Sequence, residues 1–158
     1  MSRLIEMSYG EGWIYVLMTP SDYNRVKIGK TINNPLLRLR NLKTGDPYLS
    51  LQVAYFIPPH FGLNLKGVED LIHNALGKSR IPFLDDEDQL YKRSEWFQMD
   101  SREAESVVDN VLRHHNFQIT NDKLRLDTVK HYTAIKYYDH ELRYEACHLL
   151  SSLTEGNW

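Results

Sequence analysis

The sequence predicts an α/β (α+β) fold in which a small central mixed or antiparallel sheet is flanked by helices. Two short runs rich in β-branched and aromatic residues, at 12–17 and 26–31, flank a segment of turn-forming residues and indicate a β-hairpin. Glycine and proline are frequent in the first half of the chain. Neither occurs between Pro82 and Gly156, so the second half can carry long helices.

Helices and strands are expected to alternate after the hairpin. A helix should begin at Pro35, a favoured first position, with Asn33 or Asn34 as its cap. Residues 49–57 are rich in β-branched and aromatic side chains and predict a third strand. Residues 65–76 carry apolar side chains at helical spacing and predict a second helix.

The second half is expected to complete this unit and then to extend it. Residues 79–93 predict a charged loop and residues 95–99 a short strand. Asp100, with a glutamate three residues later, fits the cap of the next helix. We therefore expect one domain over residues 9–117. Residues 118–158 are expected to form a helical extension that serves targeting, dimerisation or packing.

The composition of the chain argues against a disulfide-stabilised protein, a secreted protein and a membrane-spanning protein. A chain of 158 residues with one cysteine, Cys147, can bury a core but can form no internal disulfide. The N-terminus does not resemble a signal peptide, and no apolar run reaches the roughly 20 residues that span a bilayer. We expect a cytoplasmic, intracellular protein with no membrane partner.

Charge is distributed unevenly along the chain. Residues 1–78 carry nine Lys/Arg and six Asp/Glu, whereas residues 79–158 carry ten and fifteen. Residues 25–43 contain six cations and no acid. Such a cluster is either a solvated basic face or a surface that binds nucleic-acid phosphates. The candidates for phosphate or DNA contact are Lys30, Thr31, Arg40 and Lys43.

Two pairs of residues are candidates for chemistry. Tyr15 and Lys27 lie on the two strands of the hairpin, where cross-strand neighbours are about 5 Å apart, so we expect these side chains to meet. Glu69 and His73 are four residues apart on one helix and share a stripe. Taken singly, Tyr15 is better explained as a packing residue, and the Glu69–His73 stripe as a polar helix edge.

Five short motifs follow one another along the chain: Ile14-Tyr15, Lys27-Ile28-Gly29-Lys30-Thr31, Arg38-Leu39, Val68-Glu69 with His73, and Glu95-Trp96-Phe97. In this order they resemble the GIY-YIG endonuclease superfamily and its phage-type branch, in which the second motif reads Lys-Ile-Gly. The resemblance covers residues 10–117. The resemblance implies a GIY-YIG-like fold and a metal-dependent DNA endonuclease that makes nicks or double-strand cuts, of phage or mobile-element origin.

The resemblance also implies a role for each matching residue. Tyr15 would be the general base, helped by Lys27, which replaces the second tyrosine of the family. Arg38 would hold the scissile phosphate. Glu69 would bind one Mg²⁺, with Mn²⁺ as the alternative ion, and His73 would orient Glu69 or the phosphate. The expected partner is double-stranded DNA, and a homodimer is left open.

The sequence departs from the family pattern at two places. Trp13 stands where the simple first motif has glycine, and the position four residues after Arg38 is Leu42 rather than histidine. Two alternatives therefore stay open beside the nuclease. One is a catalytically silent DNA- or protein-binding module on the same scaffold. The other is an interaction protein that acts through its C-terminal extension.

Overall fold

A computed structural model describes residues 12–58, 63–84, 91–121 and 133–144. Seven strands form one sheet in the order β4-β5-β2-β1-β3-β7-β6. Neighbouring strands are antiparallel except for the parallel pair β6 and β7. The expected α/β class with a mixed sheet between helices is confirmed.

The predicted hairpin forms the centre of the sheet. Strands β1 (Gly12–Thr19) and β2 (Asp22–Thr31) pair along most of their length, and β3 (Ser50–Ile57) pairs with the other edge of β1. Because β1 lies between two partners, nearly all of its side chains are buried. The strand that carries Tyr15 is therefore rigidly held on both sides.

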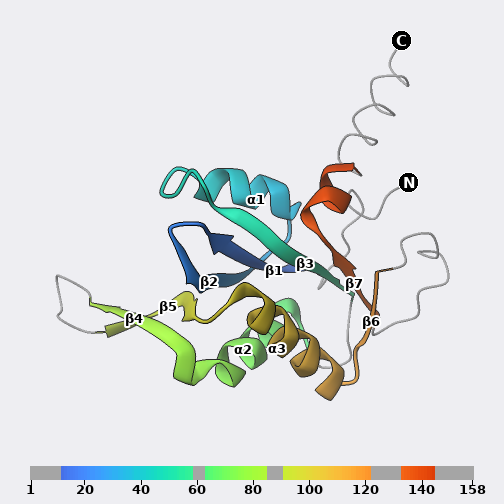
Figure 1. Ribbon diagram of the computed structural model, residues 1–158. Coiled ribbons are helices and arrows are strands. Elements are labelled where there is room, and N and C mark those ends of the chain that lie inside the picture. Colours follow the sequence, from blue (N-terminus) through green and yellow to red (C-terminus); the bar gives the residue numbers. More distant parts are fainter. Residues whose placement is uncertain (1–11, 59–62, 85–90, 122–132, 145–158) are drawn as a thin grey trace, which may run out of the picture.

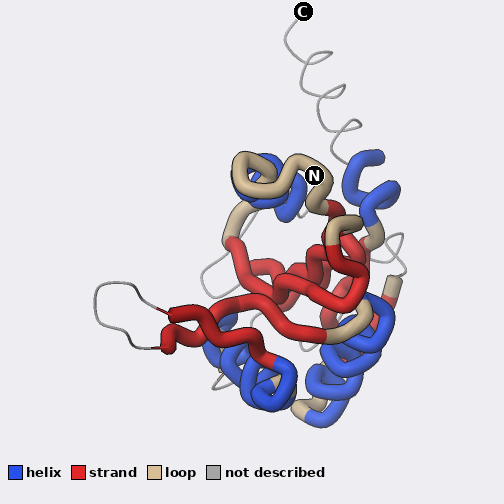
Figure 2. The backbone as a smooth tube through the Cα atoms, turned by 60° about the vertical axis from the view of Figure 1, so that its left-hand side comes forward, coloured by secondary structure: helices blue, strands red, loops and turns tan. Residues whose placement is uncertain are grey.

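Helices cover both faces of this sheet (Figure 1; Figure 2 gives a second view). Helix α1 (Pro35–Leu42) covers one face, where Leu39 packs with Trp13, Tyr15 and Leu17. Helices α2 (Leu65–Ala75) and α3 (Ser101–His114) cover the other face, over a second core cluster. Successive side chains of β1 point to opposite faces of the sheet, so this strand contributes residues to both core clusters.

The caps of two helices agree with the sequence. Asn34 Oδ1 accepts a hydrogen bond from the backbone N–H of Leu36 at 2.9 Å, which makes Asn34 the cap. Asp100 Oδ1 accepts from the N–H of Arg102 at 2.7 Å and begins α3. These local side-chain bonds fix where each helix starts.

Two expectations about secondary structure were wrong. The segment predicted as a charged loop, residues 79–93, contains β4 (Arg80–Leu84) and the start of β5 (Tyr91–Gln98), which pair with each other. The two strands were missed because each is formed by pairing with the other, and β4 is the edge strand of the sheet. Residues 85–90 lie outside the described part of the chain.

The extension expected to be helical also contributes strands. β6 (Gln118–Thr120) and β7 (Thr133–Tyr137) join the same sheet, and β7 pairs with β3. A five-residue segment such as TAIKY is too short for its pattern to distinguish a strand from a helix, and pairing with β3 makes it a strand. Residues 139–144 are helical, whereas residues 122–132 and 145–158 lie outside the described residues.

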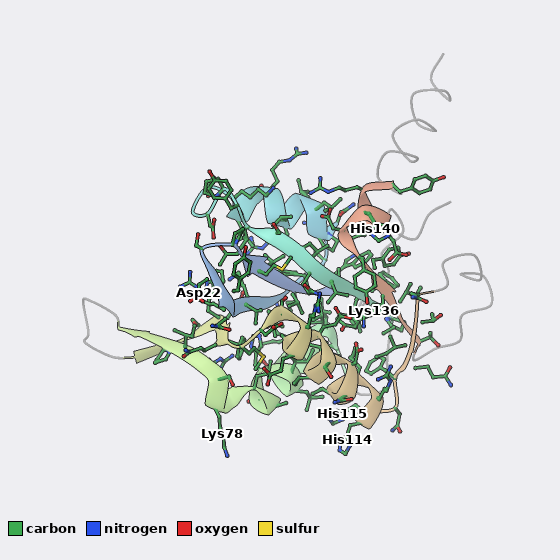
Figure 3. The ribbon with its side chains drawn as sticks, viewed as in Figure 1. Asp22, Lys78, His114, His115, Lys136 and His140 are labelled. Carbon is green, nitrogen blue, oxygen red and sulfur yellow. The ribbon has the colours of Figure 1, made fainter. Side chains whose placement is uncertain are left out.

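A network of half-buried charges links β7 to α3. Lys136 Nζ lies 2.6 Å from Glu105 Oε2 and 2.9 Å from Asp109 Oδ2 (Lys136 is labelled in Figure 3). The hydroxyl of Tyr55 donates to Asp109 at 2.6 Å, and that of Tyr138 donates to Glu105 at 2.9 Å. The carboxylates are thus paired and hydrogen-bonded, as buried charges must be.

In the part of the chain that the structure describes, no helix has both the length and the apolar character needed to cross a membrane.

Candidate active site

Tyr15 lies across the backbone of Gly29. The two residues are directly opposite in the β1–β2 register, and Tyr15 is only 1% exposed. A Cβ atom added to Gly29 would lie 2.4 Å from the Tyr15 hydroxyl oxygen and 3.0 Å from Glu95 Oε2. Only glycine leaves room for the tyrosine ring at this position. The Lys-Ile-Gly motif therefore provides the space that Tyr15 occupies.

Arg38 is the cation that contacts Tyr15. Helix α1 packs on the Tyr15 face of the sheet, and its Arg38 lies close enough to the Tyr15 hydroxyl group to lower the pKa of the phenol through its charge and through hydrogen bonding. Because a guanidinium group only donates, the phenol oxygen is the acceptor. The first turn of α1, fixed by its Asn34 cap, holds Arg38 in this position.

The surroundings of Tyr15 favour its neutral form. Burial raises the pKa of Tyr15, and the nearby carboxylates of Glu95 and Glu69 raise it further. The hydrogen bond and charge of Arg38 act in the opposite direction, but the net shift of the pKa is upward from 10.0. Tyr15 is therefore a neutral phenol at pH 7, and Arg38 is the group that favours its ionised form.

Glu69 reaches the same region from α2. The residue is 8% exposed, and its Oε2 atom is buried with no hydrogen-bond partner among the described residues. Burial and the neighbouring charge of Glu95 raise the pKa of Glu69, whereas Lys30 lowers it. A buried carboxylate oxygen without a partner is costly, so Glu69 is the candidate ligand of this site.

Glu95 on β5 is the residue of this site to which the sequence analysis gave no role. Its Oε2 atom forms an ion pair with Lys27 Nζ at 2.9 Å, and its charge acts on both Tyr15 and Glu69. Sequence did place Glu95 in a motif with Trp96 and Phe97. Its role was missed because β5 reaches the site by pairing with β2, which is far from it in sequence.

Lys27 lies in the site but not where it was expected. Lys27 is directly opposite Leu17, and Gly29 is directly opposite Tyr15. The expected direct pairing of Lys27 with Tyr15 was therefore wrong by two residues in the strand register. Lys27 nevertheless shares a sheet face with Tyr15, because its opposite residue, Leu17, lies two positions after Tyr15 on β1. Its ammonium group neutralises Glu95 instead. The role proposed for Lys27 in the reaction stays a prediction.

His73 is fixed to the protein through both ring nitrogens. Nε2 donates to the carbonyl oxygen of Ile28 at 2.8 Å, and Nδ1 accepts from Arg80 Nη2 at 2.6 Å. Burial lowers the pKa of His73, which keeps the ring neutral and consistent with this pattern. His73 thus ties α2 to the strand residue before Gly29. An additional contact with a phosphate stays a prediction.

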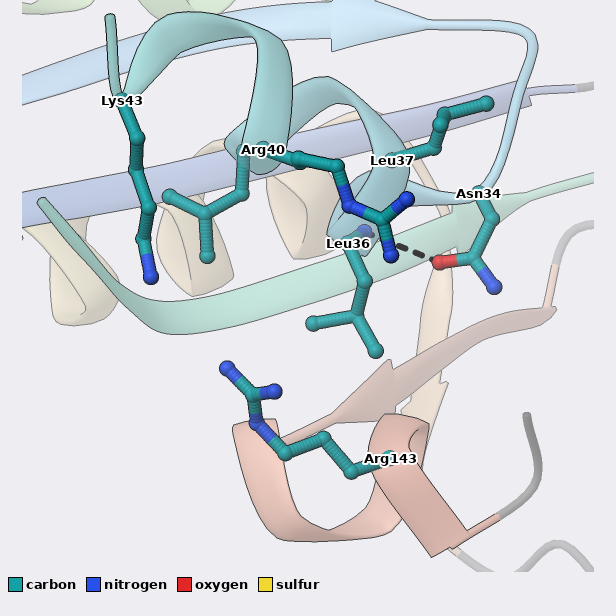
Figure 4. A pocket seen from close by; sticks show the side chains of 7 residues that line it. Asn34, Leu36, Leu37, Arg40, Lys43 and Arg143 are labelled. Carbon is teal, nitrogen blue, oxygen red and sulfur yellow. Dashed lines mark hydrogen bonds between the residues drawn. The ribbon is translucent and has the colours of Figure 1, made fainter. Parts of the chain in front are cut away.

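The basic residues predicted to contact phosphate do not form one surface. Lys30 is exposed and close enough to Glu69 to lower its pKa, and Thr31 Oγ1 accepts from the N–H of Asn33 at 3.1 Å. Arg40 and Lys43 instead line a separate groove beside α1 (Figure 4). The structure therefore divides the cluster 25–43 between two places.

A cavity of about 690 Å³ opens beside Lys27. Arg25 and Trp96 also line it, and the guanidinium carbon of Arg25 lies 4.9 Å from the centre of the Trp96 ring. The wall of this cavity carries the two cations and Asp46, whereas Tyr15, Arg38 and Glu69 do not line it. Among the described residues, no group of three or more His, Cys, Asp or Glu side chains is arranged to hold a metal ion.

These elements define a mixed α+β domain with a tyrosine, an arginine and two carboxylates gathered at its central hairpin. The T5orf172 domain matches residues 12–112, which contain all four side chains. The match covers more than half of the chain, so the protein belongs to the T5orf172 domain family. No curated protein and no solved structure matches the chain.

Proposed function

We propose that this protein is a metal-dependent DNA endonuclease of the GIY-YIG type, which hydrolyses phosphodiester bonds by nicking or by double-strand cleavage. The observation that carries the proposal is that Tyr15 lies near both Arg38 and the buried Glu69, whose Oε2 atom has no hydrogen-bond partner among the described residues. Membership of the T5orf172 family and the order of the five motifs support it.

Arg38 would bind the scissile phosphate. Its guanidinium group offers five N–H donors, of which the contact with Tyr15 engages only part. Arg38 is exposed on α1, so a phosphate can reach it. Charge that develops on the phosphate oxygens in the transition state would be stabilised by these donors, which are already oriented.

Tyr15 would take a proton from the attacking water. A phenol with a pKa above 10 is mostly protonated at pH 7, so only a small fraction of the protein has the base form. Arg38 enlarges that fraction by favouring the phenolate. Lys27 helps indirectly, because it neutralises the Glu95 carboxylate that opposes ionisation of Tyr15.

Glu69 would hold a divalent cation, Mg²⁺ or alternatively Mn²⁺. The residues present fit such an ion, since Mg²⁺ in enzymes is commonly bound through one or two carboxylates together with substrate phosphate and water. Glu69 supplies the open oxygen, and Glu95 is the neighbouring second carboxylate. When bound, the ion supplies Lewis-acid stabilisation of the leaving 3′ oxygen.

A cleavage assay tests the proposal. Supercoiled plasmid and duplex DNA are incubated with Mg²⁺ and with wild type, Glu69→Ala, Arg38→Ala or the control Glu103→Ala, which changes an exposed glutamate on α3. We expect Glu69→Ala to reduce cleavage to background and Arg38→Ala to slow it by about 10²–10³-fold. The control should cleave like wild type.

Folded wild-type protein that leaves every DNA substrate intact would overturn the proposal. DNA binding that persists in chelator without any cleavage, and that Tyr15→Phe does not change, would support the catalytically silent binding module instead.

A further inference from the structure

A second basic site lies on the other side of α1. A groove of about 450 Å³ separates α1 from the helical residues 139–144, and Figure 4 shows side chains from both segments at its rim. Leu36 and Leu39 contribute to its lining, and Tyr15, Arg38, Glu69 and Glu95 do not. The candidate active site therefore does not account for this groove.

The groove carries positive charge on both sides. Arg40 and Lys43 come from α1, and Arg143 comes from the segment opposite, whereas no acidic residue lines the groove. Arg143 Nε donates to Asp139 Oδ2 at 2.7 Å on the same helical segment, which helps to hold the guanidinium group in position. A groove lined by positive charges and apolar side chains strengthens the local electrostatic potential and favours the binding of an anion.

The groove and the candidate active site are related through α1. Arg38 and Arg40 are two residues apart and so point about 200° apart around the helix. The helix with its side chains is about 10 Å wide, and phosphates along one DNA strand advance by about 3.4 Å per nucleotide. A strand that crosses α1 from Arg38 would bring phosphates about three nucleotides from the cut to the groove.

We propose that this groove binds the sugar–phosphate backbone of the DNA strand that flanks the cut. The inference rests on the proposed function for its substrate, and it adds a binding site. Arg143 lies beyond the residues 12–112 that the family match covers. The C-terminal segment thereby acquires a role in holding DNA, and it does more than pack against the sheet.

The salt dependence of DNA binding tests this proposal. Binding of a fluorescent duplex is measured by anisotropy in chelator, so that no cleavage occurs, for wild type, Arg143→Gln and the double variant Arg40→Gln/Lys43→Gln. Lys78→Gln is the matched control, because Lys78 is an exposed lysine on the opposite side of the sheet from α1 (Figure 3). Arg143→Lys keeps the charge and reports on folding of the segment.

Each phosphate contact that is lost should reduce the slope of log K against log salt by about 0.9 and weaken binding about eightfold at 0.1 M salt. We expect one such step for Arg143→Gln and about two for the double variant. Lys78→Gln and Arg143→Lys should keep the wild-type slope. Unchanged slopes in both groove variants would overturn the inference.

The binding measurement and the cleavage assay can fail independently of each other. If the groove variants lose affinity and wild type does not cleave, the groove binds DNA and the endonuclease proposal fails. If wild type cleaves and the groove variants keep the full salt slope, the endonuclease stands and the groove inference fails. Wild type that binds no duplex at any salt concentration overturns the groove inference as well.

Discussion

Glu69→Gln should make the protein more stable while it removes the metal ligand. The wild-type carboxylate is 8% exposed and has an oxygen without a partner among the described residues. A carboxyl whose pKa is raised in the folded state binds its proton more tightly there than in the unfolded chain. The ionised form therefore costs stability at any pH above the folded pKa.

The magnitude follows from the cost of a buried polar group without a hydrogen bond, about 1–3 kcal/mol. Glutamine has the same shape and no charge, and its amide leaves part of this cost in place, so we expect a gain of about 1 kcal/mol at pH 7.5. For a protein of this size, that gain raises Tm by about 2–4 °C.

Thermal melting at several pH values provides the assay. The gain should be largest at neutral pH and should disappear as the pH falls below about 4.3, where the carboxyl is protonated in both states. Added Mg²⁺ should raise the Tm of wild type but not that of Glu69→Gln. The control is Asp70→Asn on the same helix, which breaks an exposed pair with Lys66 and should cost less than about 1 kcal/mol.

A lower Tm for Glu69→Gln at neutral pH would refute this reasoning, as would a gain that does not change with pH. A lower Tm would mean that the Glu69 carboxylate is stabilised by partners in the folded protein. A gain independent of pH would mean that it does not arise from the ionisation of Glu69.

Three further predictions concern the residues around this site and the β7 attachment. Gly29→Ala should displace the Tyr15 ring, because the new Cβ would lie 2.4 Å from its hydroxyl oxygen; cleavage should fall at least tenfold, and a wild-type rate would contradict the close packing. Cleavage limited by chemistry should rise about tenfold per pH unit from pH 7 to 9, since the pKa of Tyr15 lies above 10 and its phenolate is the base; a flat profile in single-turnover assays would exclude Tyr15 as that base. Lys136→Met should cost about 1–3 kcal/mol in urea unfolding, because Glu105 and Asp109 then lose their half-buried cation, whereas Lys66→Met should change stability little.

Local signals in the sequence predicted the central fold. The hairpin, the α1 cap at Asn34 and the α3 cap at Asp100 depend on residues within a few positions of one another, and the structure confirms all three. β4 and β7 were missed because a strand is decided by its partner. β7 pairs with β3, about 80 residues earlier in the chain, and no local pattern encodes that pairing.

The same distinction separates the parts of the candidate site. Tyr15, Arg38 and Glu69 were found because each belongs to a motif with a recognisable local form, and the structure brings their charges together. The cation that acts on the pKa of Tyr15 is decided by the strand register and by the packing of α1. The local motifs predicted Lys27 for this role, and the structure has Arg38 in it. Glu95 acquires its partners only after β5 has paired with β2.

The position of β7 also determines where this chain can be shortened. Without β6 and β7, which lie beyond the family match at residues 12–112, β3 would become an edge of the sheet. Its row of unpaired N–H and C=O groups, with buried apolar side chains on both faces, would then template pairing with other chains. A protein cut at the family boundary would aggregate through β3, so the boundary seen in sequence comparison is not a boundary of folding.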